Sequence, residues 1–264
     1  MLDKIFKSII VVFAAIGFIM SLGFASIKFK WTDTSGMVDN QRKTFLKEPQ
    51  KFPFQDLNET KLFKEVVLKD KTDLEKVEKE TGVKARLIVS NLFVEQIRLY
   101  TTQRELFKNI FEPLKILGVQ SQFSWGVMGI KQETAIEIEK NLKDKDSPFY
   151  LGKDFENILD FKTADHDTER FERLTDGKSR YYSYLYTALY IKEIEAQWKR
   201  NGFDISNNIG VLSTLFNIGF VHSIPNNNPQ TGGAGIDINN VTYSFGTLAD
   251  LFYYSDELIG VFPR

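Results

Sequence analysis

The segment 83–107, VKARLIVSNLFVEQIRLYTTQRELF, constrains the fold more than any other, because protein has to cover it on almost every side. It contains no Gly or Pro and is rich in helix-forming residues, which predicts a helix. At 100° per residue its apolar side chains spread around nearly the whole circumference, as in a helix inside a domain. One narrow polar stripe remains, formed by Asn91, Glu95 and Arg98 at spacing i, i+4, i+7. A buried helix with a single polar stripe is typical of the floor of a cleft.

The rest of the chain predicts more helices and few strands, so the fold class is mainly α. Helical spacing, capping residues and breakers define these segments. Residues 153–177 are polar and allow no assignment, and residues 225–240 predict a long Gly/Asn/Pro loop. The expected helices are a charged helix and turn over 57–82 ended by Gly82, a short helix over 108–123 broken by Pro113, and helices over 132–142, 180–202, 204–220 (with Asn207 or Asn208 near its start and Gly219 near its end) and about 246–257.

The N-terminus contains an uncharged run of about twenty residues between Lys7 and Lys28, long enough to cross a bilayer of ~30 Å. Two interpretations are open, an uncleaved signal anchor and a signal peptide cleaved near Gly23-Phe24-Ala25. A core helix at the start of a soluble chain is a third. Either of the first two predicts a location outside the cytoplasmic membrane, with a division into 1–30 as signal segment, 31–82 as spacer and helical extension, and 83–264 as the main domain.

Composition excludes several classes of function. A formal charge of −1 gives no electrostatic footprint for nucleic acid. The absence of Cys excludes disulfides, thiolate metal sites and cysteine nucleophiles. The cluster at 164–169, ADHDTE, is a poor metal site because adjacent ligands rarely point at one ion. TGGAG at 231–235 lacks the Lys of a phosphate-binding loop. We therefore expect no metal and no cofactor.

Three segments in order resemble the lysozyme-like lytic transglycosylases. LIVSNLFVEQ, which contains Glu95, is similar to that family's helix ending in Glu-Ser. WGVMGIKQETA resembles its Gly-Leu-Met-Gln…Thr-Ala segment. VLSTLFNIGF, preceded by a Tyr-rich helix, resembles its Ala-Tyr-Asn-Ala-Gly segment. The resemblance spans about Val83 to Phe220, with departures at Gln96, Gly129 and Phe216.

The resemblance implies a lysozyme-like helical domain that cleaves the MurNAc–GlcNAc bond of peptidoglycan with one glutamate, Glu95, as acid and then base. Physical chemistry leads independently to a similar role. A carboxyl on an otherwise apolar helix is costly to ionise, so its pKa should rise, and a protonated Glu can act as general acid. We find no second carboxylate to place opposite Glu95, which fits the route that the resemblance implies, in which the substrate's N-acetyl group can assist and the sugar's own 6-hydroxyl closes an anhydro ring. The alternative is that Glu95 pairs with Arg98 on a structural surface stripe.

The remaining candidates are expected to shape the cleft. Gly129 would let the backbone approach a sugar, and Met128 would be an adaptable apolar contact. Trp125 could stack on a pyranose face, and Asn217 could hold an N-acetyl group or Glu95. Each has a structural alternative, in which the loop packs on the core and Asn217 belongs to a helix C-terminal turn. The aromatic candidates Phe216, Tyr186 and Tyr190 are also expected to line the cleft, and the alternative for them is a place in the core.

The sequence thus predicts a membrane-tethered peptidoglycan lytic transglycosylase or muramidase, with glycan strands as its partner. The other hypothesis is a non-catalytic lysozyme-like envelope module that binds glycan or a partner protein. The departures at Gln96, Gly129 and Phe216 motivate it.

Overall fold

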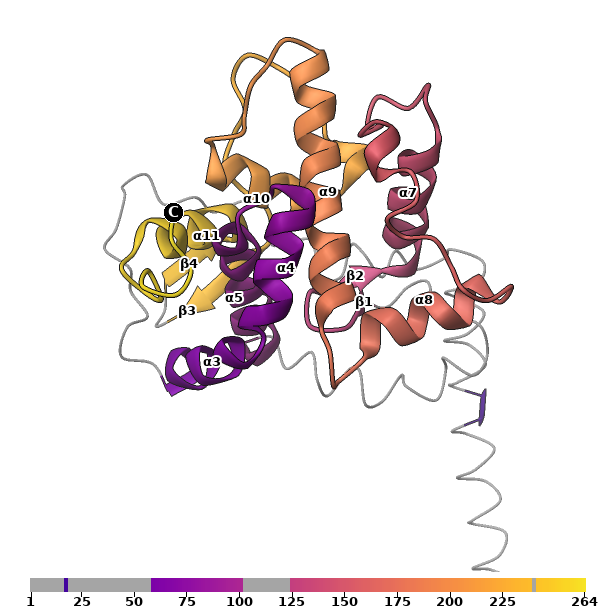
Figure 1. The fold of residues 1–264 in the computed structure, drawn as a ribbon. Helices are drawn as coiled ribbons and strands as arrows, with labels where there is room; N and C mark the ends of the chain where they lie inside the picture. The colour runs from indigo at the N-terminus through magenta and orange to yellow at the C-terminus, as the bar shows by residue number, and fades with distance from the viewer. Residues whose placement is uncertain (1–16, 19–57, 102–123, 239–240) are drawn as a thin grey trace, which may run out of the picture.

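The computed structural model describes residues 17–18, 58–101, 124–238 and 241–264. Its fold is mainly helical, as the sequence predicts. Figure 1 shows the arrangement. In chain order the elements are α3 (Asn58–Lys69), α4 (Lys71–Thr81), α5 (Ala85–Thr101), β1 (Ser124–Trp125), β2 (Ile130–Lys131), α7 (Gln132–Lys143), the 3₁₀ turn η2 (Lys153–Phe155), α8 (His166–Thr175), α9 (Tyr181–Arg200), α10 (Ile209–Ile218), the 3₁₀ turn η3 (Phe220–His222), β3 (Gly235–Ile238), β4 (Val241–Ser244) and α11 (Phe245–Tyr254).

Helix α5 lies inside the molecule, which confirms the interpretation of its sequence. Every residue from Ala85 to Arg98 is buried except Gln96. The helix packs against α3, α4, α9, α11 and strand β3. The stacked rings of Phe93 and Phe252, 4.7 Å apart, form part of the contact with α11. Because α3 and α4 both contact α5, the helical part of the predicted extension belongs to the same packed body.

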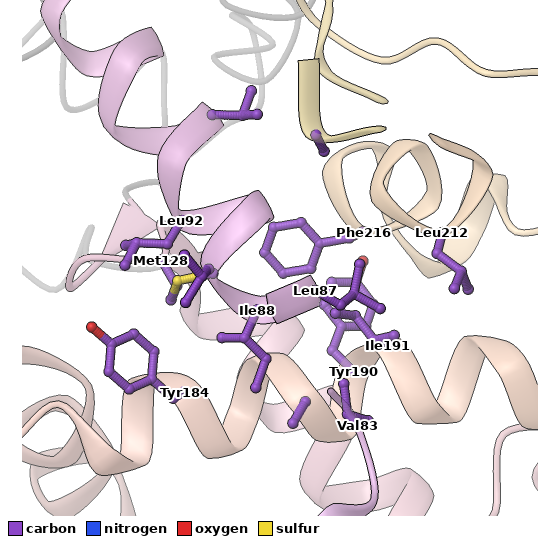
Figure 2. Close-up of a cluster of buried hydrophobic side chains, with 14 of the residues drawn as sticks. Val83, Leu87, Ile88, Leu92, Met128, Tyr184, Tyr190, Ile191, Leu212 and Phe216 are labelled. Atoms are coloured by element: carbon purple, nitrogen blue, oxygen red, sulfur yellow. The ribbon is translucent and has the colours of Figure 1, made fainter. Parts of the chain in front are cut away.

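Helix α9 is the second buried helix, and five of the other described helices pack against it. It contacts α4, α5 and α10, and it also contacts α7 and α8. Its buried side chains enter the same core as those of α5 (Figure 2). The tertiary arrangement around the polar stripe of α5 therefore depends on how these two helices pack.

Capping residues set several helix ends as the sequence predicts. The side chain of Asn208 accepts a hydrogen bond from the backbone N–H of Val211 at 3.1 Å and starts α10. Gly82 ends α4 in the left-handed conformation, with φ of 75°. Helix α8 lies within residues 153–177, for which the sequence allowed no assignment. A sequence signal for its start was Asp165, whose side chain accepts a 3.2 Å hydrogen bond from the backbone N–H of Thr168 and caps the helix.

The predicted loop over 225–240 is partly wrong, because β3 and β4 form an antiparallel hairpin in which Gly235 pairs with Ser244. The sequence signal was the alternation in IDINNVTY around an Asn-Asn pair. The expected helix over 108–123 and most of the N-terminal signal segment lie outside the described residues. Within the residues that are described, no helix combines the length and the apolar character required to cross a membrane.

Candidate functional site

Glu95 lies in the buried part of α5 and is 5% exposed. Its Oε1 atom lies 3.4 Å from Nη1 of Arg98, one helical turn further along, and both side chains are 7% exposed. The predicted pair with Arg98 is therefore present, but it lies in the interior and not on a surface stripe. Burying a charged group is costly unless it is paired, and the guanidinium of Arg98 pairs the buried carboxyl of Glu95.

The polar stripe continues at Asn91, which is fully buried. Its Nδ2 donates to the carbonyl of Leu87 at 2.9 Å, whereas its Oδ1 has no hydrogen-bond partner. Asn91 precedes Glu95 by four residues, so the two side chains share one face of the helix. An unpaired buried acceptor is costly, and native proteins contain few of them. Asn91 lies on the predicted stripe, although the sequence does not identify its unpaired oxygen.

The Trp–Met segment forms a tight hairpin beside α5. Strands β1 and β2 pair through Trp125 and Ile130, and residues 126–129 form the turn. Gly126 and Gly129 have φ of 63° and 64°, a region that favours glycine. Nε2 of Gln96 donates a 2.8 Å hydrogen bond to the carbonyl of Val127 in this turn. The first two predicted segments, far apart in sequence, are thus in direct contact.

Trp125 and Met128 point into the core and not into solvent. Trp125 is 2% exposed, and its ring meets Phe171 of α8 edge to face at 5.1 Å. Met128 is 1% exposed and belongs to the cluster in Figure 2, where it is drawn next to Leu92. The expected stacking of Trp125 on a sugar is therefore not available in this conformation, because protein already covers the ring. The turn backbone, with half-buried Gly129, is the part that reaches the surface.

The third segment lies on the other flank of α5. Phe216 is 6% exposed and packs against Tyr190 at 5.5 Å between ring centroids. Phe216 belongs to the same buried cluster as Leu87 of α5 (Figure 2). Oδ1 of Asn217 accepts a 2.8 Å hydrogen bond from the backbone N–H of Ala234, so in this conformation the amide holds the glycine-rich segment and not Glu95.

The two tyrosines of α9 are structural in this conformation. Tyr186 is fully buried and donates to Oε1 of Glu139 at 2.6 Å. Arg170 donates to both oxygens of Glu139, at 2.7 Å each, so both carboxylate oxygens have partners. Burial and then the nearby Glu139 raise the pKa of Tyr186. Burial, followed by Glu137 and Glu193, raises the pKa of Tyr190.

A second buried carboxyl, that of Glu193 on α9, was not predicted from the sequence. It is 0% exposed, and its Oε2 accepts a 3.0 Å hydrogen bond from Nδ2 of Asn141 on α7. Its Oε1 has no hydrogen-bond partner. Burial raises the pKa of Glu193 well above the usual range. The sequence of this Tyr-rich helix gave no signal that set Glu193 apart from Glu195, the half-buried acid two residues further on.

A cavity of about 100 Å³ lies on the flank of α5 that carries Gln96. Its wall is mainly apolar, and Arg180 and Tyr184 form its polar end. Both of these side chains donate to Oδ2 of Asp70, at 2.7 and 2.6 Å. Among the described residues, no group of three or more His, Asp or Glu side chains is arranged to hold a metal ion.

Comparison with models of known protein families, with curated proteins and with solved structures found no match to this chain.

Proposed function

We propose that this chain is a lysozyme-like enzyme that cleaves the MurNAc–GlcNAc bond of peptidoglycan, as a lytic transglycosylase or a muramidase, with Glu95 as its single acid and base. The resemblance of three segments in family order motivates the proposal. We place the enzyme at the extracytoplasmic face of the membrane, tethered by the uncharged run between Lys7 and Lys28 or released from it.

One observation carries the proposal. Gln96, which follows the candidate acid directly, bonds the Val127 carbonyl of the glycine turn at 2.8 Å. A lysozyme-like site needs the helix with the acid and this turn to be neighbours, although the chain separates them by about thirty residues. Phe216 on the other flank of α5 is consistent with the third segment forming the opposite wall.

The proposed cleavage uses the carboxyl of Glu95, one oxygen of which is held by Arg98. The first step requires Glu95, which is ion-paired with Arg98, to take up a proton, and the carboxyl then gives this proton to the bridging glycosidic oxygen as the C1–O bond breaks. In the second step the carboxylate takes a proton from the 6-hydroxyl of the same sugar, whose oxygen bonds C1 and closes an anhydro ring. If water attacks in place of the hydroxyl, the product has a reducing end and the enzyme is a muramidase.

Arg98 is suited to hold Glu95 during these steps. The guanidinium faces Oε1 at 3.4 Å, and the described residues place no hydrogen bond on Oε2. Oε2 would then be the oxygen that exchanges the proton with substrate. A fixed carboxyl loses less orientational freedom in the transition state, which is worth a large factor in rate.

The test is digestion of purified sacculi by the parent protein and by Glu95→Gln. We expect the parent to release muropeptides and the variant to be slower by at least about a hundredfold, since general acid catalysis contributes 10²–10⁴. Glu172→Gln, an exposed change on α8, is the matched control and should digest at the parent rate. A Glu95→Gln protein that digests at the parent rate rejects the proposal. Mass spectrometry separates anhydro ends, which indicate a transglycosylase, from reducing ends, which indicate a hydrolase.

A second candidate is a module that binds glycan without cleaving it. The departures at Gln96, Gly129 and Phe216 favour it, because they change the segments that would position a substrate for cleavage. The same experiment decides between the two. If the parent and the variant both stay bound to sacculi and neither releases a product, the result supports the binding module.

A further inference from the structure

Gln96 occupies a distinctive position in α5. From Ala85 to Arg98 it is the one residue that is not buried, and it directly follows Glu95. Its amide nitrogen crosses from the helix to the carbonyl of Val127, at 2.8 Å. In the sequence Gln96 is only a departure from a family pattern, and its contact with the turn is visible only in the fold.

The other side of the turn rests on α8 and α9. A Cβ at Gly126 would lie 2.0 Å from the carbonyl oxygen of Leu174 and 2.9 Å from Oγ of Ser183. Ser183 itself donates to that same carbonyl at 2.9 Å. The turn is therefore seated against the junction of α8 and α9, with no space for a side chain. Gln96 then links this seat to the helix that carries Glu95.

We propose that Gln96 is a positioning residue, which holds the backbone of residues 127–129 against α5 at the position next to Glu95 and so limits the space in which the sugar meets the acid. The inference rests on the proposed function and adds a second residue to its machinery. A turn held close to the carboxyl keeps the 6-hydroxyl oriented and keeps water away from C1. A loosened turn admits water, so more of the intermediate ends as a reducing sugar.

The test uses Gln96→Met, which keeps the length of the side chain but removes the donor, and Gln96→Glu, which places a carboxylate against the Val127 carbonyl. The matched control is Arg200→Met, because Arg200 on α9 holds the carbonyls of Pro148 and Tyr150 in the same manner at another loop. Two quantities are measured on the full chain. One is amide hydrogen exchange at residues 127–129 by NMR, and the other is the ratio of reducing to anhydro ends released from sacculi.

We expect both Gln96 variants to speed exchange at residues 127–129 by about tenfold, the effect of losing one hydrogen bond. We also expect a several-fold rise in the ratio of reducing to anhydro ends. This ratio does not depend on how much protein is folded, so a general loss of stability leaves it unchanged, as we expect for Arg200→Met. Unchanged exchange in both variants, or an unchanged ratio despite faster exchange, overturns the inference.

A parent that releases no product rejects the proposed function, and with it the catalytic part of this inference. The exchange measurement still stands in that case. Faster exchange in both Gln96 variants, without a change in Arg200→Met, supports the anchoring of the turn by Gln96, whereas parent-like exchange rejects it.

Discussion

Arg98 and Glu95 form an ion pair inside the protein, with 3.4 Å between Nη1 and Oε1 and with both side chains 7% exposed. Removing one partner of a buried pair leaves the other charge uncompensated, which typically costs 3–5 kcal/mol. We predict that Arg98→Met lowers the free energy of unfolding by about 3 kcal/mol in urea denaturation at neutral pH. The double variant Glu95→Gln/Arg98→Met should recover part of this loss, because it removes both charges. A double variant no more stable than Arg98→Met would show that the two groups are not coupled.

Arg86 ties the first turn of α5 to the C-terminal segment. Its five N–H groups make five hydrogen bonds, and the five accepting carbonyls belong to Phe252, Tyr253, Ser255, Glu257 and Phe262. Lys has three donors and no planar fork, so Arg86→Lys leaves carbonyls unpaired in the interior.

We predict that Arg86→Lys lowers the free energy of unfolding by at least about 3 kcal/mol, since each buried unpaired group costs 1–3 kcal/mol. The control is Lys84→Met on the neighbouring turn, whose salt bridge with Glu78 is solvent-exposed and should contribute less than about 1 kcal/mol. Urea denaturation measures both. Equal effects of the two variants would contradict the structural role of Arg86.

Glu193 predicts a pH dependence of stability. Burial raises the pKa of its carboxyl well above the usual range, so the folded protein holds this proton over a pH window in which the unfolded chain has lost it. The contribution of Glu193 to stability therefore falls as pH rises above the ordinary Glu pKa, until the folded-state pKa is reached. The decrease is at most about tenfold in the folding constant per pH unit.

Glu193→Gln keeps an acceptor for Asn141. We predict that the free energy of unfolding of this variant increases, relative to that of the parent, as the pH rises from 5 to 8. Burial also raises the pKa of Glu195 to about 7, but that group titrates in both proteins and cancels in the difference. Thermal denaturation at several pH values measures the effect. A constant difference across the range would show that Glu193 does not titrate there. The control Glu172→Gln, at an exposed position of α8, should follow the parent.

Gly126 allows a prediction about the seat of the turn. Gly126→Ala combines a positive φ of 63° with a Cβ only 2.0 Å from the Leu174 carbonyl, a backbone atom that cannot rotate away. The control is Gly202→Ala, where φ is 84° but nothing lies within 4 Å. We expect a loss of about 1 kcal/mol for Gly202→Ala and a loss several times larger for Gly126→Ala, measured by urea denaturation. Similar losses would mean that the turn can shift away from α8.

Much of the fold could be predicted because its signals are local. The burial of α5 followed from the distribution of apolar residues around one helix. The limits of α4 and α10 followed from Gly82 and Asn208, whose caps involve residues within four positions of each other. The stripe containing Glu95 and Arg98 also followed, since i, i+3 and i+4 neighbours meet on any helix.

The roles of the aromatic candidates could not be predicted in the same way. Trp125 and Tyr186 each have a partner on another element, Phe171 for the first and Glu139 for the second. A ring that lines a cleft and a ring that fills a core have the same local pattern. Which of the two it becomes depends on which distant segment covers it.

The amino-acid sequence by itself determined that α5 is a buried helix with a polar face, because the 3.6-residue period and the side chains of one segment decide both. Only the tertiary structure decided that Gln96 bonds the glycine turn and that Arg86 donates to the carbonyls of the C-terminal segment. It also decided that Glu193 of α9 is buried against Asn141 of α7. Each of these contacts joins residues more than thirty positions apart. Their partners are chosen by the packing of whole helices, which no local pattern specifies.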